Sequence, residues 1–102
     1  GSGYGIISGA ATQIAMVRFS ARAARWVADE QWHPDQSGHW HDDGGYELRV
    51  PYAAAEELLQ DVLAYGPEAE IIAPAALREA AADRLRRAAV RYADTAVNIE
   101  KL

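Results

Sequence analysis

The sequence predicts an α+β fold of the ferredoxin-like type, with a four-stranded antiparallel sheet in the element order β-α-β-β-α-β and an additional C-terminal helix. Three observations lead to this prediction. Four segments of strand length alternate with stretches of helical spacing in the required order. The two middle segments flank a glycine-containing turn, and the last long stretch follows a proline. Right-handed crossovers would place both internal helices on the same face of the sheet.

The length of 102 residues leaves room for one domain. Residues 1–11 are predicted to be a tag and linker, because Gly1 to Gly3 resemble a cloning remnant and the glycine-rich run after them has no period. The ferredoxin-like domain is predicted over residues 12–93. The tail at residues 94–102 is expected to fray.

The first strand is predicted at Thr12–Phe19 and the first helix at Ala21–Gln31, with Ser20 as the N-cap of that helix. The helix is expected to stop before Pro34, since a proline disfavours helical backbone in the residue before it. A hairpin is then predicted from Gln36–His41 and Tyr46–Tyr52.

The turn of that hairpin is Asp42-Asp43-Gly44-Gly45, whose glycines are expected to supply the positive φ angles of a tight turn. Alternation along the second arm predicts one buried face and one exposed face. The exposed face carries Glu47 and Arg49.

A second helix is predicted at Ala53–Tyr65, with Gly66-Pro67 as its stop. The short strand Ala69–Ala73 follows, and Pro74 is expected to begin the last helix as a first-turn proline. The apolar stripe of this last helix has spacings of three and four, and it consists of Leu77, Ala81, Leu85, Ala88 and Tyr92.

The composition excludes several classes of protein. The chain has no cysteine, so it has neither a disulfide framework nor a thiolate metal site, as is typical of a reducing compartment. It has no apolar run of about 18 residues that would span a bilayer and no signal-peptide pattern. We therefore expect a cytoplasmic location without membrane association.

The net charge of -5 is unevenly distributed. Between Asp29 and Glu70 there are eleven acidic residues and a single basic one, Arg49, whereas both flanking segments are basic. The net charge argues against nucleic-acid binding by the whole surface. The acidic middle and basic flanks indicate either charge pairing, within the chain or between subunits, or ordinary solvated helix faces.

Several stretches resemble, in order, the C-terminal extension of bacterial transcription regulators of the WYL family, often called the WCX domain. They are RFSARAARWVADEQWHP, the DDGG turn with ELRVPY, ELLQDVLAYGPEAEIIAP and ALREAAADRLRRAAVRY, and they span the chain from about Tyr4 to Tyr92. The most specific pieces are the RFS strand end, the EQWHP segment, the YG helix stop and the P-x-x-LR that begins the last helix. None of them is a catalytic signature.

This resemblance implies a regulatory and oligomerisation domain of a longer regulator. An N-terminal winged helix-turn-helix would bind DNA, a middle WYL domain would sense an effector, and this domain would dimerise and transmit the signal. The implied partners are a second copy of the chain and the WYL and helix-turn-helix domains of the same polypeptide, with DNA contacted only through the N-terminal domain. No enzyme activity, catalytic residue or cofactor is expected.

The alternative function is a stand-alone sensor with an ACT-like arrangement, which would bind an anionic metabolite through Arg18 and Arg49 at a subunit interface. Both arginines are expected on the helix-free face of the sheet, and their forked donors match bidentate acceptors. An ordinary surface network with Glu47 and Glu70 is the other interpretation. Apolar side chains on the same face, such as Ile14, would need a cover.

Three more groups have two interpretations each. His33, His39 and His41 lie near Asp42 and Asp43, but the spacing matches no known ligand motif, so an exposed polar hairpin is favoured and no metal is predicted.

The tryptophans Trp26, Trp32 and Trp40 form either a base-stacking platform or part of the core. The core is favoured for Trp26, which lies on the inner stripe of the first helix, and for Trp32, where the chain must turn. Trp40 is left open between core and interface.

Arg84, Arg87 and Arg91 share one side of the last helix, where they would contact a nucleic-acid backbone. The acidic charge of the domain argues against this role.

Overall fold

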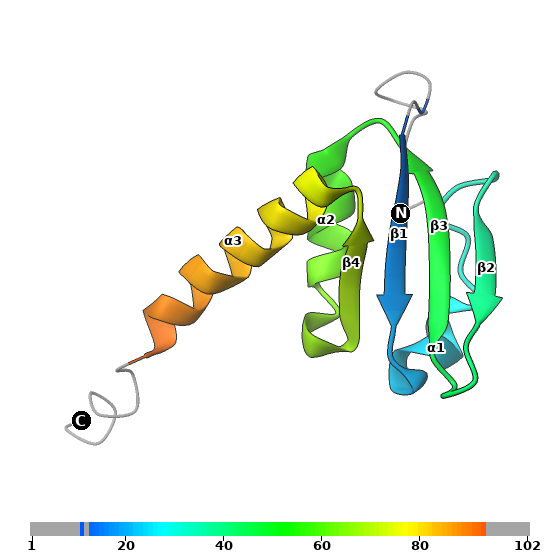
Figure 1. Ribbon diagram of the computed structural model, residues 1–102, viewed down its shortest axis with the longest axis horizontal. Helices are drawn as coiled ribbons and strands as arrows, with labels where there is room; N and C mark the ends of the chain where they lie inside the picture. The colour runs from blue at the N-terminus through cyan, green and yellow to red at the C-terminus, as the bar shows by residue number, and fades with distance from the viewer. Residues whose placement is uncertain (1–10, 12, 94–102) are drawn as a thin grey trace.

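The computed structural model describes Ala11 and residues 13–93. Its elements follow the predicted order (Figure 1), and they are β1 (Gln13–Phe19), α1 (Ala21–Val27), β2 (Ser37–Trp40), β3 (Tyr46–Tyr52), α2 (Ala55–Leu63), the 3-10 turn η1 (Gly66–Glu68), β4 (Ala69–Ala73) and α3 (Ala75–Tyr92). The predicted tag and linker apart from Ala11, residue Thr12 of the predicted first strand, and the predicted tail at 94–102 lie outside the described residues.

The four strands form one antiparallel sheet in the order β2-β3-β1-β4. This order, with β1 and β3 in the centre, confirms the predicted ferredoxin-like topology. Figure 1 shows α1 and α2 behind the sheet. We call the opposite side of the sheet the helix-free face, since none of the helices in the described part of the chain covers it.

The core lies between the sheet and these two helices. The buried residues of the central strands are Ala15, Val17, Phe19, Tyr46, Leu48, Val50 and Tyr52. Those of the two helices are Ala23, Ala24, Val27, Leu58, Leu59 and Val62. Full burial of each large apolar side chain contributes roughly 1.5 to 3 kcal/mol. The small alanines of α1 let its backbone approach the sheet closely.

Several local predictions are confirmed. The Ser20 Oγ accepts a hydrogen bond from the backbone N–H of Ala23 at 3.2 Å, so Ser20 is the N-cap of α1. Gly66 has a φ of +59° and follows α2 as the left-handed stop.

The prediction for the hairpin turn is half right, because Gly44 has a positive φ and Gly45 does not. At Gly45 the reason for glycine is space: an added β-carbon would lie 3.0 Å from the backbone oxygen of Phe19. The Gly45 N–H also donates to Asp43 Oδ1 at 2.8 Å, which closes the turn.

The first helix is shorter than predicted, and it ends at Val27. The chain after it is held by the side chain of Gln36, whose Oε1 accepts from the N–H groups of Trp32 at 2.6 Å and His33 at 3.1 Å. The Gln36 Nε2 also donates to the carbonyl of Glu30 at 2.9 Å. This side chain supplies hydrogen bonds that a continued helix would have supplied, and it turns Trp32 into the core.

The predicted apolar stripe of the last helix is buried only at its beginning. Leu77 and Ala81 are buried, whereas Leu85 is 48% exposed and Tyr92 is 75% exposed. Figure 1 shows α3 leaving the end of β4 and projecting away from the sheet, so none of the other described helices and strands lies against its last turns. Pro74 lies just before the helix, as its N-cap. Among the described helices, none has the length and apolar character needed to cross a membrane.

Candidate functional site

The helix-free face carries a row of charged residues that crosses all four strands. The strand registers align His39 of β2 with Glu47 of β3, Glu47 with Arg18 of β1, and Arg18 with Glu70 of β4. Arg78 of α3 extends the row, because it donates to Glu70 Oε2 at 2.7 Å. Acidic and basic or imidazole side chains therefore alternate across the sheet, a pattern that stabilises cross-strand pairs.

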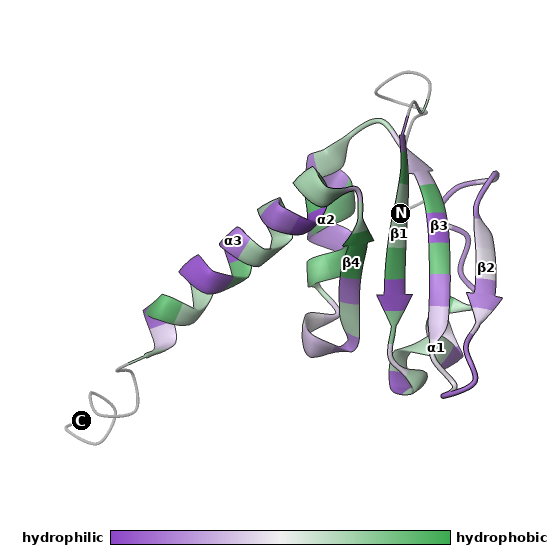
Figure 2. Ribbon diagram, viewed as in Figure 1, coloured by the Kyte–Doolittle hydropathy of each residue, from purple (hydrophilic) through white to green (hydrophobic). Residues whose placement is uncertain are grey.

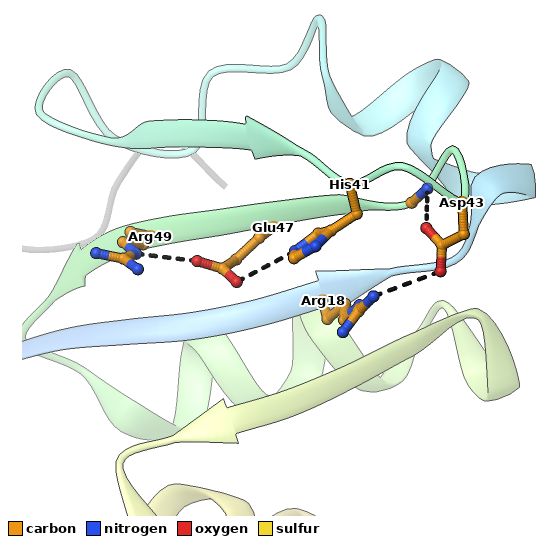
Figure 3. A network of polar contacts seen from close by, with 6 residues as sticks. Arg18, His41, Asp43, Glu47 and Arg49 are labelled. Carbon is orange, nitrogen blue, oxygen red and sulfur yellow. Dashed lines mark hydrogen bonds and ion pairs between the residues drawn. The ribbon is translucent and has the colours of Figure 1, made fainter.

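Glu47 is the centre of this network (Figure 3). Its carboxylate accepts a hydrogen bond from Arg49 Nε at 3.0 Å and contacts His41 Nε2 at 3.3 Å. Burial of the carboxylate would raise the pKa of Glu47, but the hydrogen bonds from Arg49 and His41 outweigh that effect and hold the pKa below its ordinary value. Glu47 therefore keeps its negative charge to lower pH than an ordinary glutamate does.

The two arginines of the predicted anion site both lie on the helix-free face, each beside a carboxylate. Arg18 pairs with Asp43 at 3.4 Å, and Arg49 pairs with Glu47. The hydrogen bond from the backbone N–H of Gly45 and the charge of Arg18 lower the pKa of Asp43, although burial of the carboxylate acts in the opposite direction. Figure 3 shows the two guanidiniums on opposite sides of Glu47, so the structure does not bring them together.

The histidines lie in two places. The rings of His39 and His41 meet edge-on, with 5.3 Å between their centroids, beside Glu47. His33 is in the loop after α1, where its Nδ1 accepts a hydrogen bond from the backbone N–H of Asp35 at 3.0 Å. Within the described residues, no group of three metal-ligating side chains is close enough to hold an ion.

Two shallow depressions adjoin on the helix-free face, and Ser37 and Arg49 line both of them. The first has a volume of about 430 Å³, and its other lining residues are Gly38, His39, His41 and Glu47. The second has a volume of about 360 Å³, and its other lining residues are Ile14, Met16, Asp35, Pro51 and Ala73. Sequence reasoning missed Asp35, because no periodic pattern shows that the loop after α1 reaches this face.

The tryptophans do not form one surface. Trp32 is buried and packs against the buried Phe19 and the partly buried Tyr65. The centroids of the three rings are 5.2 to 6.2 Å apart. Trp26 is 56% exposed, which corrects the prediction that it lies in the core. The buried side of α1 consists of Ala23, Ala24 and Val27, and Trp26 lies outside it, with Arg25 5.4 Å from its ring. Trp40 is also 56% exposed and packs edge-on against Tyr46.

Arg84 and Arg87, suggested above for nucleic-acid contact, each pair with a carboxylate within the chain. Arg84 forms two hydrogen bonds of 2.8 Å with Glu56 of α2. This pairing lowers the pKa of Glu56 and raises that of Arg84. Arg87 pairs with Asp83 at 3.0 Å, one turn earlier on α3. The Arg84 pair joins α3 to α2.

The comparisons with known proteins agree with this fold. A family model described as the WCX domain matches residues 11–89. A search of the curated proteins finds no match. The matched range includes all four strands, α1, α2 and most of α3. The chain therefore belongs to the WCX domain family, and it is a domain of the kind associated with WYL-type transcription regulators.

Proposed function

We propose that this chain is the regulatory and oligomerisation domain of a WYL-family transcription regulator. It would pass the effector state sensed by a WYL domain to a helix-turn-helix domain of the same polypeptide, and it would do so by dimerising. The domain then works through binding and packing, without making or breaking covalent bonds. The observation that carries the proposal is the projecting half of α3, which we define as residues 85–92.

The projecting half continues an apolar stripe that is already used for packing. Leu77 and Ala81 are buried by the body of the domain, and the same stripe runs on to Leu85 and Tyr92, which are exposed. Val90 is also exposed, at 73%, but helical spacing places it on the opposite side of α3 from this stripe. Figure 2 shows apolar and polar residues alternating along this part of the helix. A second copy of the chain would cover these side chains and supply the packing that the monomer lacks.

The charge of the projecting half indicates which surface of the second copy it would meet. Residues 85–92 contain Arg86, Arg87 and Arg91 and no acidic residue. Two such helices laid side by side would bring their guanidiniums together, which is unfavourable. The segment between Asp29 and Glu70 is strongly acidic, so α3 of each copy is expected to lie on the acidic body of the other. A two-fold axis satisfies both contacts at once.

The attachment of α3 makes it suited to transmit a signal. Arg78 donates to both Glu70 and the carbonyl of Ile71, and Arg84 is held by Glu56. The helix is thus coupled to the edge strand β4 and to α2, so a displacement of the sheet by a neighbouring domain would change the direction of α3. Such a change would alter the dimer and thereby the spacing of the DNA-binding domains.

Sedimentation velocity of the chain over a range of concentrations tests the proposal. We expect the 11.1 kDa chain to approach twice its mass at high concentration and to dissociate as salt is raised. The double substitution Leu85→Ser and Tyr92→Ser should abolish association, whereas Glu79→Gln on the packed half of α3 should not. A chain that stays monomeric at every concentration, or a serine variant that associates like the wild type, would overturn the proposal.

A further inference from the structure

The second depression of the helix-free face has the features of a small binding site. Its volume of about 360 Å³ is near the lower end of the range of ligand sites, so it fits a small metabolite. The depression lies between the edge of β2, the central strands and the end of β4. We call it the Asp35–Arg49 depression, after the two charged residues that line it.

The two charges are opposite in sign and do not neutralise each other. Among the described residues, no ion pair joins Asp35 to Arg49, although both line the same depression. Arg49 uses its Nε to bind Glu47, and no hydrogen bond from its two terminal nitrogens is found within the described residues. Within the described chain, the Asp35 carboxylate has no hydrogen-bond or ion-pair partner. The depression therefore holds one accepting and one donating charged group that remain available.

The rest of the lining is mainly apolar. Ile14 is 63% exposed, and Met16 and Pro51 are partly exposed beside it. Ser37 contributes a hydroxyl between the charged and apolar parts. A single exposed isoleucine on a sheet is ordinary. Here the isoleucine lies in the same depression as a methionine, a proline and two opposite charges, so the depression has both an apolar and a charged lining.

We propose that the Asp35–Arg49 depression binds a free apolar α-amino acid in its zwitterionic form. The carboxylate of the ligand would pair with the Arg49 guanidinium, and its ammonium group would pair with Asp35. The ligand side chain would pack on Ile14, Met16 and Pro51. A simple anion would be repelled by Asp35 and a simple cation by Arg49, so the zwitterion is the ligand class that satisfies both. This site goes beyond the oligomerisation role proposed above and does not depend on it.

Four matched probes test each part of this recognition, using ¹H–¹⁵N chemical shifts of the chain as the readout. They are L-leucine, 4-methylpentanoate without the ammonium group, 3-methylbutylamine without the carboxylate, and glycine without the side chain. We expect saturable shifts with L-leucine at the residues that line the depression, and binding about tenfold weaker or more for each of the other three. No saturable shift with L-leucine, L-methionine or L-phenylalanine up to their solubility limits would overturn the proposal.

Single substitutions test the contributions of the two charges to binding one at a time. Arg49→Gln and Asp35→Asn are each expected to weaken the binding of L-leucine about tenfold or more. Asp35→Asn should also strengthen the binding of 4-methylpentanoate relative to that of L-leucine. Arg49→Lys should have an intermediate effect, since lysine keeps the charge but not the fork. Arg86→Gln on α3 is the control and should bind like the wild type.

If L-leucine binds but Asp35→Asn has no effect, the site takes simple carboxylates and the zwitterion proposal is wrong. If the Leu85→Ser and Tyr92→Ser variant binds L-leucine like the wild type, the two surfaces are independent, as proposed. If that variant loses binding, the site requires the dimer and the monomer site proposed here is wrong.

Discussion

The hydroxyl end of Tyr46 occupies the space beside Gly38 in which any other residue would carry its β-carbon. A β-carbon built on Gly38 would lie 1.5 Å from the Tyr46 Oη and 2.2 Å from its Cζ. Tyr46 is buried, and its ring packs edge-on against Trp40 on β2. The edge strand β2 is therefore joined to the sheet by an aromatic ring that lies over a glycine, as well as by its backbone hydrogen bonds.

Substituting Gly38 by alanine should push the Tyr46 ring out of this position. We expect a loss of about 1 to 3 kcal/mol in the free energy of unfolding, the usual cost of overpacking, together with a change in the emission of the neighbouring Trp40. Urea unfolding followed by fluorescence measures both. Ser37→Ala, one residue earlier on the same strand, is the control and should change little. A Gly38→Ala chain as stable as the wild type would show that Tyr46 does not need this space.

The N-cap Ser20 should contribute more than an ordinary exposed serine. Its Oγ accepts from the N–H of Ala23 and donates to Glu68 Oε1 at 2.5 Å, so it joins the start of α1 to the turn before β4. Ser20→Ala is expected to lower the free energy of unfolding by about 1 to 2 kcal/mol, and Ser20→Thr by much less. Thermal unfolding followed by circular dichroism measures the loss, and equal stability of the alanine and threonine variants would contradict the capping role.

The same leucine-to-alanine change should lower the free energy of unfolding much more in the packed half of α3 than in its projecting half. Leu77 is 4% exposed, so Leu77→Ala should cost about 2 to 4 kcal/mol of stability. Leu85 is half exposed, so in dilute solution Leu85→Ala should cost less than about 0.5 kcal/mol. Chemical unfolding of the two variants at low concentration makes the comparison, and a large loss from Leu85→Ala there would mean that the monomer packs this residue.

Glu47 should contribute to stability on the acid side of the pH range. Its pKa in the folded chain lies below the ordinary value of 4.5, so the charged form is favoured by folding. The stabilisation is complete above the ordinary value and is lost as the pH falls through the lower, folded pKa. Glu47→Gln should therefore reduce the loss of stability between about pH 5 and about pH 3. Urea midpoints at the two pH values test this, with Glu79→Gln as the control whose acid-side loss should match the wild type.

The sequence predicts the sheet well, because each of its boundaries carries a local signal. β4 has the predicted limits, Ala69–Ala73, since it lies between a glycine-proline stop and the proline before α3. The hairpin follows from alternation and its turn, and the N-cap of α1 follows from Ser20. In each case the determining contacts are within a few residues along the chain.

Predictions failed where the deciding contact is distant along the chain or absent. Helical spacing gives the stripe of α3, but not how far the body extends beneath it, so the exposure of Leu85 and Tyr92 could not be predicted. Trp26 is two and three residues from the buried alanines of α1, but the side of the helix that faces the sheet is the one with Ala23, Ala24 and Val27, which the sequence alone did not decide. Asp35 carries no signal at all, because its position depends on the loop that Gln36 holds.

Hydrogen–deuterium exchange of α3 at two chain concentrations tests the proposed dimer contact most directly. An isolated helical segment of this length has marginal stability, so in dilute solution the amides of residues 85–92 should exchange rapidly while those of the packed turns near Ala81 are protected. At about a hundredfold higher concentration the projecting half should gain protection and the packed turns should change little. Exchange in residues 85–92 that is equally fast at both concentrations would contradict the account.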